Sequence, residues 1–413
     1  MLKSGQIKGR IGISTPVKNP DAYIPLETVQ LDTPTPDGGW GSLHIEPGQA
    51  PGKTGTFAVW ARNFLSGHSW VMNLNITATN RCTQTCPMCN SYVLAQANPA
   101  MLKADDFALY LEKLAPYRIA AATVCGGEPT LVPDMPEILA MAQRHFPFGV
   151  MLISNFYGNT RRVMRVMEAA LRLNIKINCS FDGFGQAADI QRGARRVSEH
   201  VFRHLRMVVE MKKAMGSKSA ITLHTVLSDL NVKQYPQILE LVGELGVNHS
   251  VGPVNHFEYD QCNDGEVPTL TAGPDLDRAL ELALSSGYLA GQSHAFVRGI
   301  ADYAAHTSPK VCPYLTPGLK RMYMFMEPNG DLSLCDRQPI GNLRTHTIDE
   351  MFRGEAYRTR LKEFIEPCTG CWYSCFVELP LALKPKNVLS LDFLHHYTPS
   401  KGKASKKVPA GAG

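Results

Sequence analysis

Short apolar runs alternate with amphipathic stretches from about residue 70 to residue 255, and this alternation constrains the fold more than any other feature. The runs predicted to be strands cover residues 71–76, 119–124, 150–153, 175–179, 220–226 and 250–254. Strand–helix units in series predict a parallel sheet with right-handed crossovers, covered on both faces. The pattern leaves an open doubly wound sheet and a partial barrel as alternatives, and in both of them ligands gather at the C-terminal ends of the strands.

Turn and capping residues place the ends of further elements. Asp105 or Asp106 can cap a helix over 107–114, and Asp134 can cap a helix over 135–144. Two more helices are predicted over 201–215 and 235–245. Later in the chain, Asn329-Gly330 predicts the turn of a hairpin over 322–335, and Thr347-Ile348-Asp349-Glu350 is a capping box that starts a helix.

Three cysteines follow the first predicted strand at the spacing C-x3-C-x2-C: Cys82, Cys86 and Cys89. A closed zinc or iron–sulfur site takes four protein ligands, and no fourth cysteine is close in sequence. Three thiolates can hold a four-iron cluster and leave one iron open to a ligand. Zinc is the main alternative, although it usually shows paired C-x2-C knuckles. Three structural cysteines are a weaker alternative, because this loop is polar and contains proline.

Polar groups also stand at the ends of the next strands. After the second strand, Gly126 and Gly127 allow close backbone approach to a ligand and place Glu128 at the rim. The third and fourth strands end in hydroxyl, amide and carboxylate groups from Ser154, Asn155, Ser180 and Asp182. Such groups suit a ribose or an amino-acid ligand, although each motif taken alone is also common in ordinary turns.

Together these motifs resemble the radical S-adenosylmethionine (radical SAM) superfamily over residues 70–255. The cysteine loop and Gly126-Gly127-Glu128 match the cluster loop and the GGE motif of that family, and Arg192 resembles the arginine that meets the cofactor carboxylate. The resemblance implies an α/β fold, a partial (β/α)6 TIM-like barrel, with a [4Fe–4S] cluster on Cys82, Cys86 and Cys89. It also implies S-adenosylmethionine contacts from Met88, Gly126, Gly127, Glu128, Ser154, Asn155, Ser180, Asp182 and Arg192.

The resemblance also implies a reaction. The open iron would chelate the cofactor, and an electron from a low-potential cluster would cleave a C–S bond. The resulting 5′-deoxyadenosyl radical would take a hydrogen atom from the substrate. A flavodoxin- or ferredoxin-type protein is the expected reductant. Met88 stands where an aromatic residue is commoner in the family, and its sulfur can still pack on adenine.

The cysteines beyond the barrel form a second pattern. Gly330-x4-Cys335, Gly341-Asn342-Leu343 and a terminal C-x2-C resemble the auxiliary-cluster domain called SPASM, or its short form, twitch. A full SPASM domain has seven cysteines and two clusters, so the smaller number here implies one further [4Fe–4S] cluster. The expected ligands are Cys312, Cys335, Cys368 and Cys371, with Cys375 as an alternative fourth ligand. A structural zinc ion is the alternative occupant.

These patterns divide the chain into five segments. They are an irregular N-terminal extension (1–68), the radical SAM core (69–255), a connecting segment that covers the barrel mouth (256–310), a small C-terminal cysteine-rich iron–sulfur domain (311–385), and a tail whose last part is disordered (386–413). Neither a signal peptide nor an apolar run of membrane-spanning length is visible, and the 11 cysteines favour a reducing compartment, so the expected location is cytoplasmic. No nucleic-acid partner is expected, because no aromatic residues interleave with the lysines of the tail.

The leading functional hypothesis is a radical SAM enzyme acting on a small polar molecule such as a sugar, aminocyclitol or nucleoside. The expected chemistry is oxidation, epimerisation or a carbon-skeleton change, with oxidoreductase as the favoured class and lyase, isomerase and transferase open. Cys262, beyond the sixth strand, could return a hydrogen atom to the substrate in an epimerisation. A peptide or protein maturase is the alternative, disfavoured because residues 1–68 show no peptide-recognition module. An iron–sulfur electron carrier is a remote alternative, which would leave the GGE motif and Arg192 without a role.

Overall fold

One sheet organises the part of the chain that the computed structural model describes, which is residues 71–255, 267–316, 319–335 and 337–382 with a few isolated positions outside them. Its strand order is β6-β5-β4-β3-β2-β1-β7-β8-β9. The first six strands run parallel and are β1 (Asn73–Thr77), β2 (Ala121–Cys125), β3 (Val150–Ser154), β4 (Lys176–Ser180), β5 (Ile221–Leu227) and β6 (Asn248–Pro253). The other edge of β1 carries β7 (Tyr323–Met326) in parallel, followed by antiparallel β8 (Asp331–Ser333) and β9 (Pro339–Asn342).

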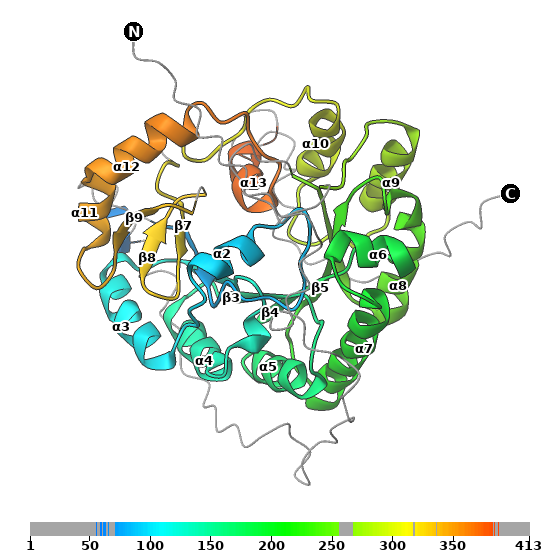
Figure 1. Cartoon of the computed structure of the whole chain (residues 1–413), viewed down its shortest axis with the longest axis horizontal. Coiled ribbons are helices and arrows are strands. Elements are labelled where there is room, and N and C mark those ends of the chain that lie inside the picture. The colour runs from blue at the N-terminus through cyan, green and yellow to red at the C-terminus, as the bar shows by residue number, and fades with distance from the viewer. Residues whose placement is uncertain are drawn as a thin grey trace, which may run out of the picture.

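Helices surround this sheet in an arc, with α13 and α10 between β7 and the β5–β6 side (Figure 1). Because β6 and β9 are the two ends of the strand order, the sheet is not closed. With the helices around it, the sheet forms the predicted partial (β/α)6 barrel. The helices are α2 (Ser91–Ala97), α3 (Ala104–Leu114), α4 (Met135–His145), α5 (Thr160–Arg172), α6 (Gly185–Arg192), α7 (Val197–Met215), α8 (Tyr235–Leu245), α9 (Pro274–Ser285), α10 (His294–Ala304), α11 (Ile348–Arg353), α12 (Glu355–Arg360) and α13 (Ser374–Ala382). Short 3-10 turns cover Ala115–Tyr117, Pro129–Leu131 and Val232–Gln234, and a π turn covers Leu361–Ile365.

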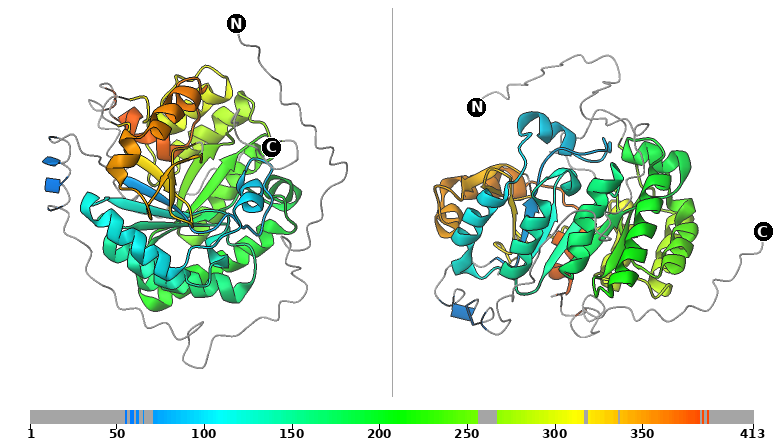
Figure 2. Two further views of the ribbon diagram at one scale, coloured as in Figure 1. Left: turned by 60° about the vertical axis from the view of Figure 1, so that its left-hand side comes forward. Right: turned by 90° about the horizontal axis from the view of Figure 1, so that it is seen from below.

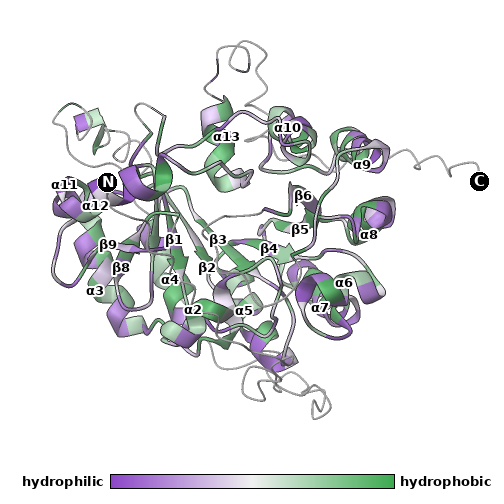
Figure 3. Ribbon diagram, turned by 45° about the horizontal axis from the view of Figure 1, so that its top comes forward, coloured by the Kyte–Doolittle hydropathy of each residue, from purple (hydrophilic) through white to green (hydrophobic). Residues whose placement is uncertain are grey.

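Alternation along the strands separates the covered face of the sheet from the barrel interior. On β5 fully buried and half-buried residues alternate, and Leu223 belongs to one core with Val208 of α7 and Ile238 of α8. The central strands are largely green in Figure 3, whereas the surrounding helices carry purple, hydrophilic segments. The apolar runs therefore form strands whose one face is sealed by helices, while the other face is left for the site.

The six predicted strands are confirmed, and α8 spans the predicted residues. The predicted caps differ. Asp105 and Asp106 lie inside the first turn of α3, where they complement the helix dipole, and Lys103 is the N-cap without a side-chain hydrogen bond. Asp134 does stand at the N-cap of α4, but its Oδ2 accepts a hydrogen bond from Ala104 N at 3.0 Å and so holds the start of α3.

The hairpin over 322–335 is confirmed as β7 and β8, and the capping box from Thr347 to Glu350 is present at α11. The pairing of β7 with β1 was not predicted, and it extends the barrel sheet into the C-terminal region. In both views of Figure 2 the orange helices α11 and α12 lie beside cyan α3, and Arg344 Nη2 is 2.5 Å from Asp106 Oδ1. The C-terminal region is thus packed against the first strand–helix unit.

The division into five segments stays a prediction. Residues 1–68 and 386–413 lie almost entirely outside the described residues, and Cys262 lies outside them too. The described part of 256–310 forms α9, which packs beside α8, and α10, which packs on β6. Among the helices that the structure describes, none is long and apolar enough to cross a membrane.

Candidate active site

The cysteine loop leaves β1 and is held against the end of β2. Gly127 N donates to Thr79 O at 2.6 Å, and Glu128 N donates to Arg81 O at 2.8 Å. A Cβ atom on Gly127 would lie 2.0 Å from Arg81 O, and one on Gly126 would lie 2.3 Å from Thr79 O. The paired glycines are therefore needed for a close approach between two segments of this chain, rather than only between backbone and ligand.

Glu128 lies beneath this junction and not at the rim, so that prediction was wrong. The residue is fully buried, and its carboxylate accepts hydrogen bonds from Ser154 Oγ at 2.8 Å, Asn155 N at 2.8 Å and Thr130 N at 3.0 Å. Burial raises the pKa of Glu128, and these hydrogen bonds oppose the rise. The carboxylate joins the ends of β2 and β3, which orients Asn155. A direct contact from Glu128 to the cofactor stays a prediction.

Asn155 connects the end of β3 to the cysteine loop. Its Nδ2 lies 3.5 Å from Cys82 Sγ and 3.1 Å from Thr83 Oγ1, and its Oδ1 accepts a hydrogen bond from Tyr157 N at 2.8 Å. Hydrogen bonds to cluster sulfurs tune the reduction potential of iron–sulfur groups. Asn155 is therefore placed to act on a thiolate, whereas the sequence predicted a contact with the cofactor.

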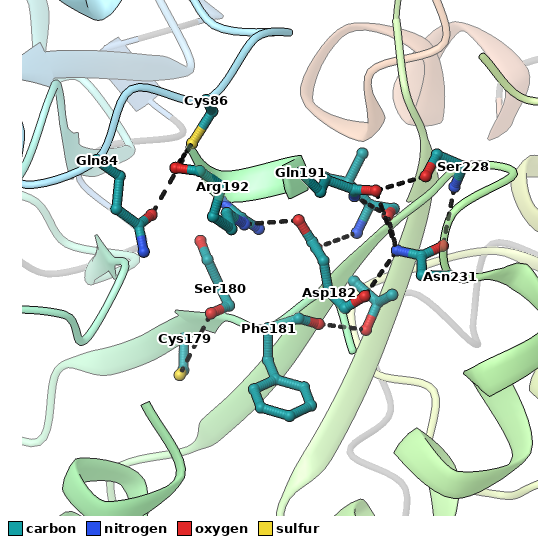
Figure 4. A network of polar contacts seen from close by, with 12 residues as sticks. Gln84, Cys86, Cys179, Ser180, Phe181, Asp182, Gln191, Arg192, Ser228 and Asn231 are labelled. Carbon is teal, nitrogen blue, oxygen red and sulfur yellow. Dashed lines mark hydrogen bonds and ion pairs between the residues drawn. The ribbon is translucent and has the colours of Figure 1, made fainter. Parts of the chain in front are cut away.

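Asp182 and Arg192 form a buried ion pair next to Cys86, as Figure 4 shows. Arg192 Nε lies 2.6 Å from Asp182 Oδ2, and Cys86 Sγ lies 3.5 Å from Arg192 O. Asp182 Oδ1 accepts a hydrogen bond from Val226 N at 2.8 Å. The guanidinium also faces the Cys86 thiol, and its charge lowers the pKa of that thiol against the effect of burial. A buried guanidinium group beside the cysteine loop fits a carboxylate ligand.

A buried network of amide side chains holds the backbone around Asp182 in place (Figure 4). Asn231 Nδ2 donates to Asp182 O and to Val226 O, each at 2.8 Å, and Gln191 Nε2 donates to Val226 O at 2.7 Å. Ser228 Oγ donates to Gln191 Oε1. The loop that carries Asp182 is thereby fixed to the end of β5.

Two further predicted contacts are half-buried. Met88 packs against the core, and Ser180 lies at the end of β4 in register with His224. Their contacts with the cofactor stay predictions. On the far side of the loop, Gly193 ends α6 with φ +58°, and a Cβ there would lie 2.2 Å from Thr85 O.

The C-terminal cysteines differ in burial and in their neighbours. Burial raises the pKa of Cys312, and the nearby Cys368 thiol raises it further, so these two residues are brought together. Trp372 anchors the neighbouring segment, because its N donates to Asn255 Oδ1 at 2.7 Å and its Nε1 donates to Phe296 O at 3.0 Å. Cys335 and Cys371 are half-buried. Cys375 is exposed as a residue, but burial of its thiol and the nearby Cys371 and Cys125 thiols raise its pKa, so it lies close to Cys371. The set of four auxiliary ligands stays a prediction.

The residues around the first loop fit an iron–sulfur cluster. Burial raises the pKa of Cys86 to about 12 and that of Cys82 well above its usual range, and the neighbouring thiols add to both shifts. Among the described residues, no three Cys, His, Asp or Glu side chains gather closely enough to hold one ion. Three cysteines in one loop suit a four-iron cluster, in which each thiolate binds a different iron.

Comparison with protein families agrees with this geometry. Residues 76–242 match the radical SAM superfamily, and residues 318–372 match the SPASM iron–sulfur cluster-binding domain. The chain is a radical SAM protein with a C-terminal SPASM domain. These two domains imply S-adenosylmethionine and [4Fe–4S] clusters as cofactors, and a radical SAM enzyme as the kind of protein.

Curated relatives resemble this radical SAM protein over more than two thirds of its length. The PqqA peptide cyclase of Gluconobacter oxydans is 24% identical over 317 residues, which cover 73% of this chain and 82% of the relative. The PqqA peptide cyclase of Methylobacterium sp. is 23% identical over 304 residues, covering 71% of this chain and 76% of the relative.

Solved structures share the fold. Streptococcus suis SuiB bound to the precursor peptide SuiA gives a TM-score of 0.56 at 14% identity, covering 75% of this chain and 71% of that one. Native anSMEcpe with bound AdoMet gives a TM-score of 0.51 at 14% identity, covering 70% of this chain and 82% of that one.

The expectation of a small polar substrate was wrong. The curated relatives are named for a peptide substrate, and none of those given above is named for a sugar, aminocyclitol or nucleoside. The expected small-molecule partner is overturned with it. The flavodoxin- or ferredoxin-type reductant stays a prediction.

Several residues of the radical SAM site were not predicted from the sequence, because each of them looks like an ordinary residue of a helix, strand or turn. Gly193 carries the strongest signal, since a glycine directly after a helix favours a left-handed cap. The supporting residues Thr83, Thr85, Gln191, His204, Ser228 and Asn231 carry no motif. Their partners are set by the fold.

His204 supports the backbone beside Asn155. Its Nδ1 lies 2.7 Å from Phe156 O and its Nε2 lies 2.9 Å from Thr160 Oγ1, while Phe156 holds φ at +53°. Burial lowers the pKa of His204 to about 4. A depressed folded-state pKa contributes stability that is present above the unfolded pKa of about 6.5 and is lost as the pH falls toward 4.

We therefore expect the unfolding free energy of His204→Gln to depend less on pH below pH 7 than that of the wild-type protein. Between pH 7 and pH 5 the wild-type protein should lose about 2 kcal/mol of unfolding free energy through this residue, and the variant should lack that loss. Urea unfolding of the cluster-free protein at both pH values measures the difference. His346→Gln, at an exposed position, is the control and should keep the wild-type slope. Equal slopes in wild type and His204→Gln would contradict the assignment.

Proposed function

We propose that this radical SAM enzyme acts on a peptide and closes a covalent link within it. One observation carries the proposal: similarity to PqqA peptide cyclases extends over 73% of this chain and 82% of the length of the Gluconobacter oxydans protein. A relative that shared only the cofactor-binding core, residues 76–242, would say little about substrate. A relative that matches a much longer part of the chain supports a similar reaction.

The electron balance of such a link agrees with two clusters. Joining two positions of a peptide removes two hydrogen atoms. When bound, the cofactors supply a 5′-deoxyadenosyl radical, which takes one hydrogen atom, and an acceptor for the electron left when the second hydrogen departs as a proton. The net change is an oxidation of the peptide by two hydrogens.

The residues of this chain have separate parts in that reaction. Arg192 and Asp182 would bind the carboxylate and amino groups of S-adenosylmethionine, and Asn155 would donate a hydrogen bond to the Cys82 thiolate. We assign Cys82, Cys86 and Cys89 to the first cluster. We assign Cys312, Cys335, Cys368 and Cys371 to the second cluster, with Cys375 as the alternative fourth ligand.

Iron analysis tests the second ligand set. After anaerobic reconstitution we expect about eight irons per chain, as two four-iron clusters require. Cys371→Ala should lower the count toward about four, and the matched variant Cys375→Ala should leave it unchanged. If Cys371→Ala keeps about eight irons per chain and Cys375→Ala falls toward about four, Cys375 and not Cys371 is the fourth ligand. About four irons with one zinc in the wild type would contradict a second cluster.

The substrate class is tested with the reconstituted, reduced enzyme and short peptides encoded beside its gene. Incubation with S-adenosylmethionine should give a peptide lighter by two hydrogens, with the new link located by fragmentation. Omitting the cofactor is the control. Unchanged peptides together with turnover of a small sugar-like molecule would reverse the proposal.

A further inference from the structure

A cluster of polar contacts joins the C-terminal region to the start of the cysteine loop. Glu327 directly follows β7, which pairs in parallel with β1, so that Glu327 and Thr77 emerge side by side. Thr77 Oγ1 donates to Glu327 Oε1 at 3.5 Å, and Asn80 Nδ2 donates to Glu327 Oε2 at 3.3 Å. Asn80 stands two residues before Cys82. One carboxylate thus contacts both the last residue of β1 and the loop that follows.

Arg337 completes the cluster. Its Nε donates to Glu327 Oε1 at 2.9 Å, and its Nη2 donates to Thr77 Oγ1 at 2.9 Å and lies 2.7 Å from Glu327 Oε1. The guanidinium also stacks 5.0 Å from the centre of the Phe325 ring. Arg337 holds φ at +58°, which a residue with a side chain adopts only when its surroundings fix it. The ion pair is largely buried, with side-chain exposures of 16% and 10%.

The other anchors of the loop start come from the barrel itself. Thr79 and Arg81 are held through backbone hydrogen bonds by Gly127 and Glu128, and Thr79 Oγ1 donates to Ala100 O at 3.0 Å. Asn80 Nδ2 also donates to Asn98 O at 3.4 Å. Glu327 and Arg337 add the contacts from the C-terminal region to Thr77 and Asn80. Pairing of β7 with β1 alone would leave Asn80 without its contact to Glu327.

We propose that the Glu327–Arg337 pair is a positioning device through which the SPASM region sets the start of the cysteine loop. A buried charge is tolerated only when it is paired and hydrogen-bonded. The Glu327 and Arg337 side chains therefore favour the arrangement in which they contact each other, Thr77 and Asn80. That arrangement fixes the positions of Thr77 and Asn80. Cofactor binding at the first cluster then depends on a domain that contributes no ligand to that cluster. The inference does not depend on the nature of the substrate.

Hydrogen exchange of the cluster-free protein tests this directly. Glu327→Gln should speed exchange of the amides in 79–90 by about tenfold while amides of β3 to β5 keep their rates, because local opening of the loop becomes easier. Glu378→Gln is the matched control. Glu378 is another buried carboxylate of the C-terminal region, and it accepts hydrogen bonds from Ser293 N and Oγ, away from the loop. It should leave exchange in 79–90 unchanged.

A double variant separates positioning from stability. Glu327→Met with Arg337→Met removes both charges, so no unpaired buried charge remains and the protein should fold. Its loop amides should still exchange about tenfold faster, and the reconstituted protein should bind S-adenosylmethionine about tenfold more weakly than wild type or Glu378→Gln. Wild-type exchange in the double variant, or equal acceleration in Glu378→Gln, would overturn the proposal. Neither readout requires the peptide, so a failure here is distinct from failure of the proposed function.

Discussion

Replacing Cys86 with alanine should abolish reductive cleavage of S-adenosylmethionine. Cys86 is the middle cysteine of its loop and the most buried of the three, and its Sγ lies against Arg192 O. Two remaining thiolates cannot hold the four-iron cluster that supplies the electron. The measurement is 5′-deoxyadenosine formed by the reconstituted, reduced protein, followed by mass spectrometry. We expect no product above the level of a cofactor-free control.

Cys179→Ala is the matched control for that loss. Cys179 is also fully buried, but it lies on β4 within the apolar core and outside the cysteine loop. Removing its thiol should cost about 1 kcal/mol of unfolding free energy, as for other small core truncations, and leave cleavage intact. Undiminished cleavage by Cys86→Ala would refute the assignment of the loop.

Replacing Arg192 with methionine should damage both stability and cofactor binding. The substitution leaves the Asp182 carboxylate buried without its cation, which typically costs about 3–5 kcal/mol. It also removes the guanidinium group that we assign to the carboxylate of S-adenosylmethionine. Urea unfolding of the cluster-free protein and titration of the reconstituted protein with S-adenosylmethionine measure the two effects. Affinity should fall by at least about tenfold, the loss expected for one charge-assisted hydrogen bond.

Arg172→Met distinguishes these effects from the general loss of an ion pair. Arg172 pairs with the buried Glu168 on α5 at 2.6 Å, and it is half-exposed and remote from the loop. Because water can replace part of that partner, the variant should be destabilised less than Arg192→Met and should bind the cofactor as wild type does. Equal affinity of Arg192→Met and Arg172→Met for S-adenosylmethionine would contradict the role of Arg192.

Local sequence patterns predicted the barrel because its strands are short apolar runs with polar residues at their ends. The same patterns could not reveal that β7 pairs with β1, since 73–77 and 323–326 are distant in sequence and neither segment carries a pairing signal. Glu327 and Arg337 were missed for that reason. Glu128 was recognised by its motif but misplaced, because a carboxylate after two glycines looks exposed until Ser154 and Asn155 supply its hydrogen bonds.

The substrate class was mispredicted for a different reason. The cofactor motifs report on the cofactor and are shared by enzymes with unrelated substrates. The choice of a small polar molecule rested on the absence of a recognisable peptide-binding module in residues 1–68, and the absence of a familiar pattern is weak evidence. Similarity to PqqA peptide cyclases over 73% of this chain carries more information.

Hydrogen transfer from the substrate tests the central claim most directly. The substrate is a deuterated form of a peptide that is encoded beside the gene and that the enzyme makes lighter by two hydrogens. It is incubated with the reconstituted, reduced protein and unlabelled S-adenosylmethionine. The account predicts 5′-deoxyadenosine that carries one deuterium, formed together with the linked peptide. Unlabelled 5′-deoxyadenosine formed at the same rate with and without every such peptide would contradict it.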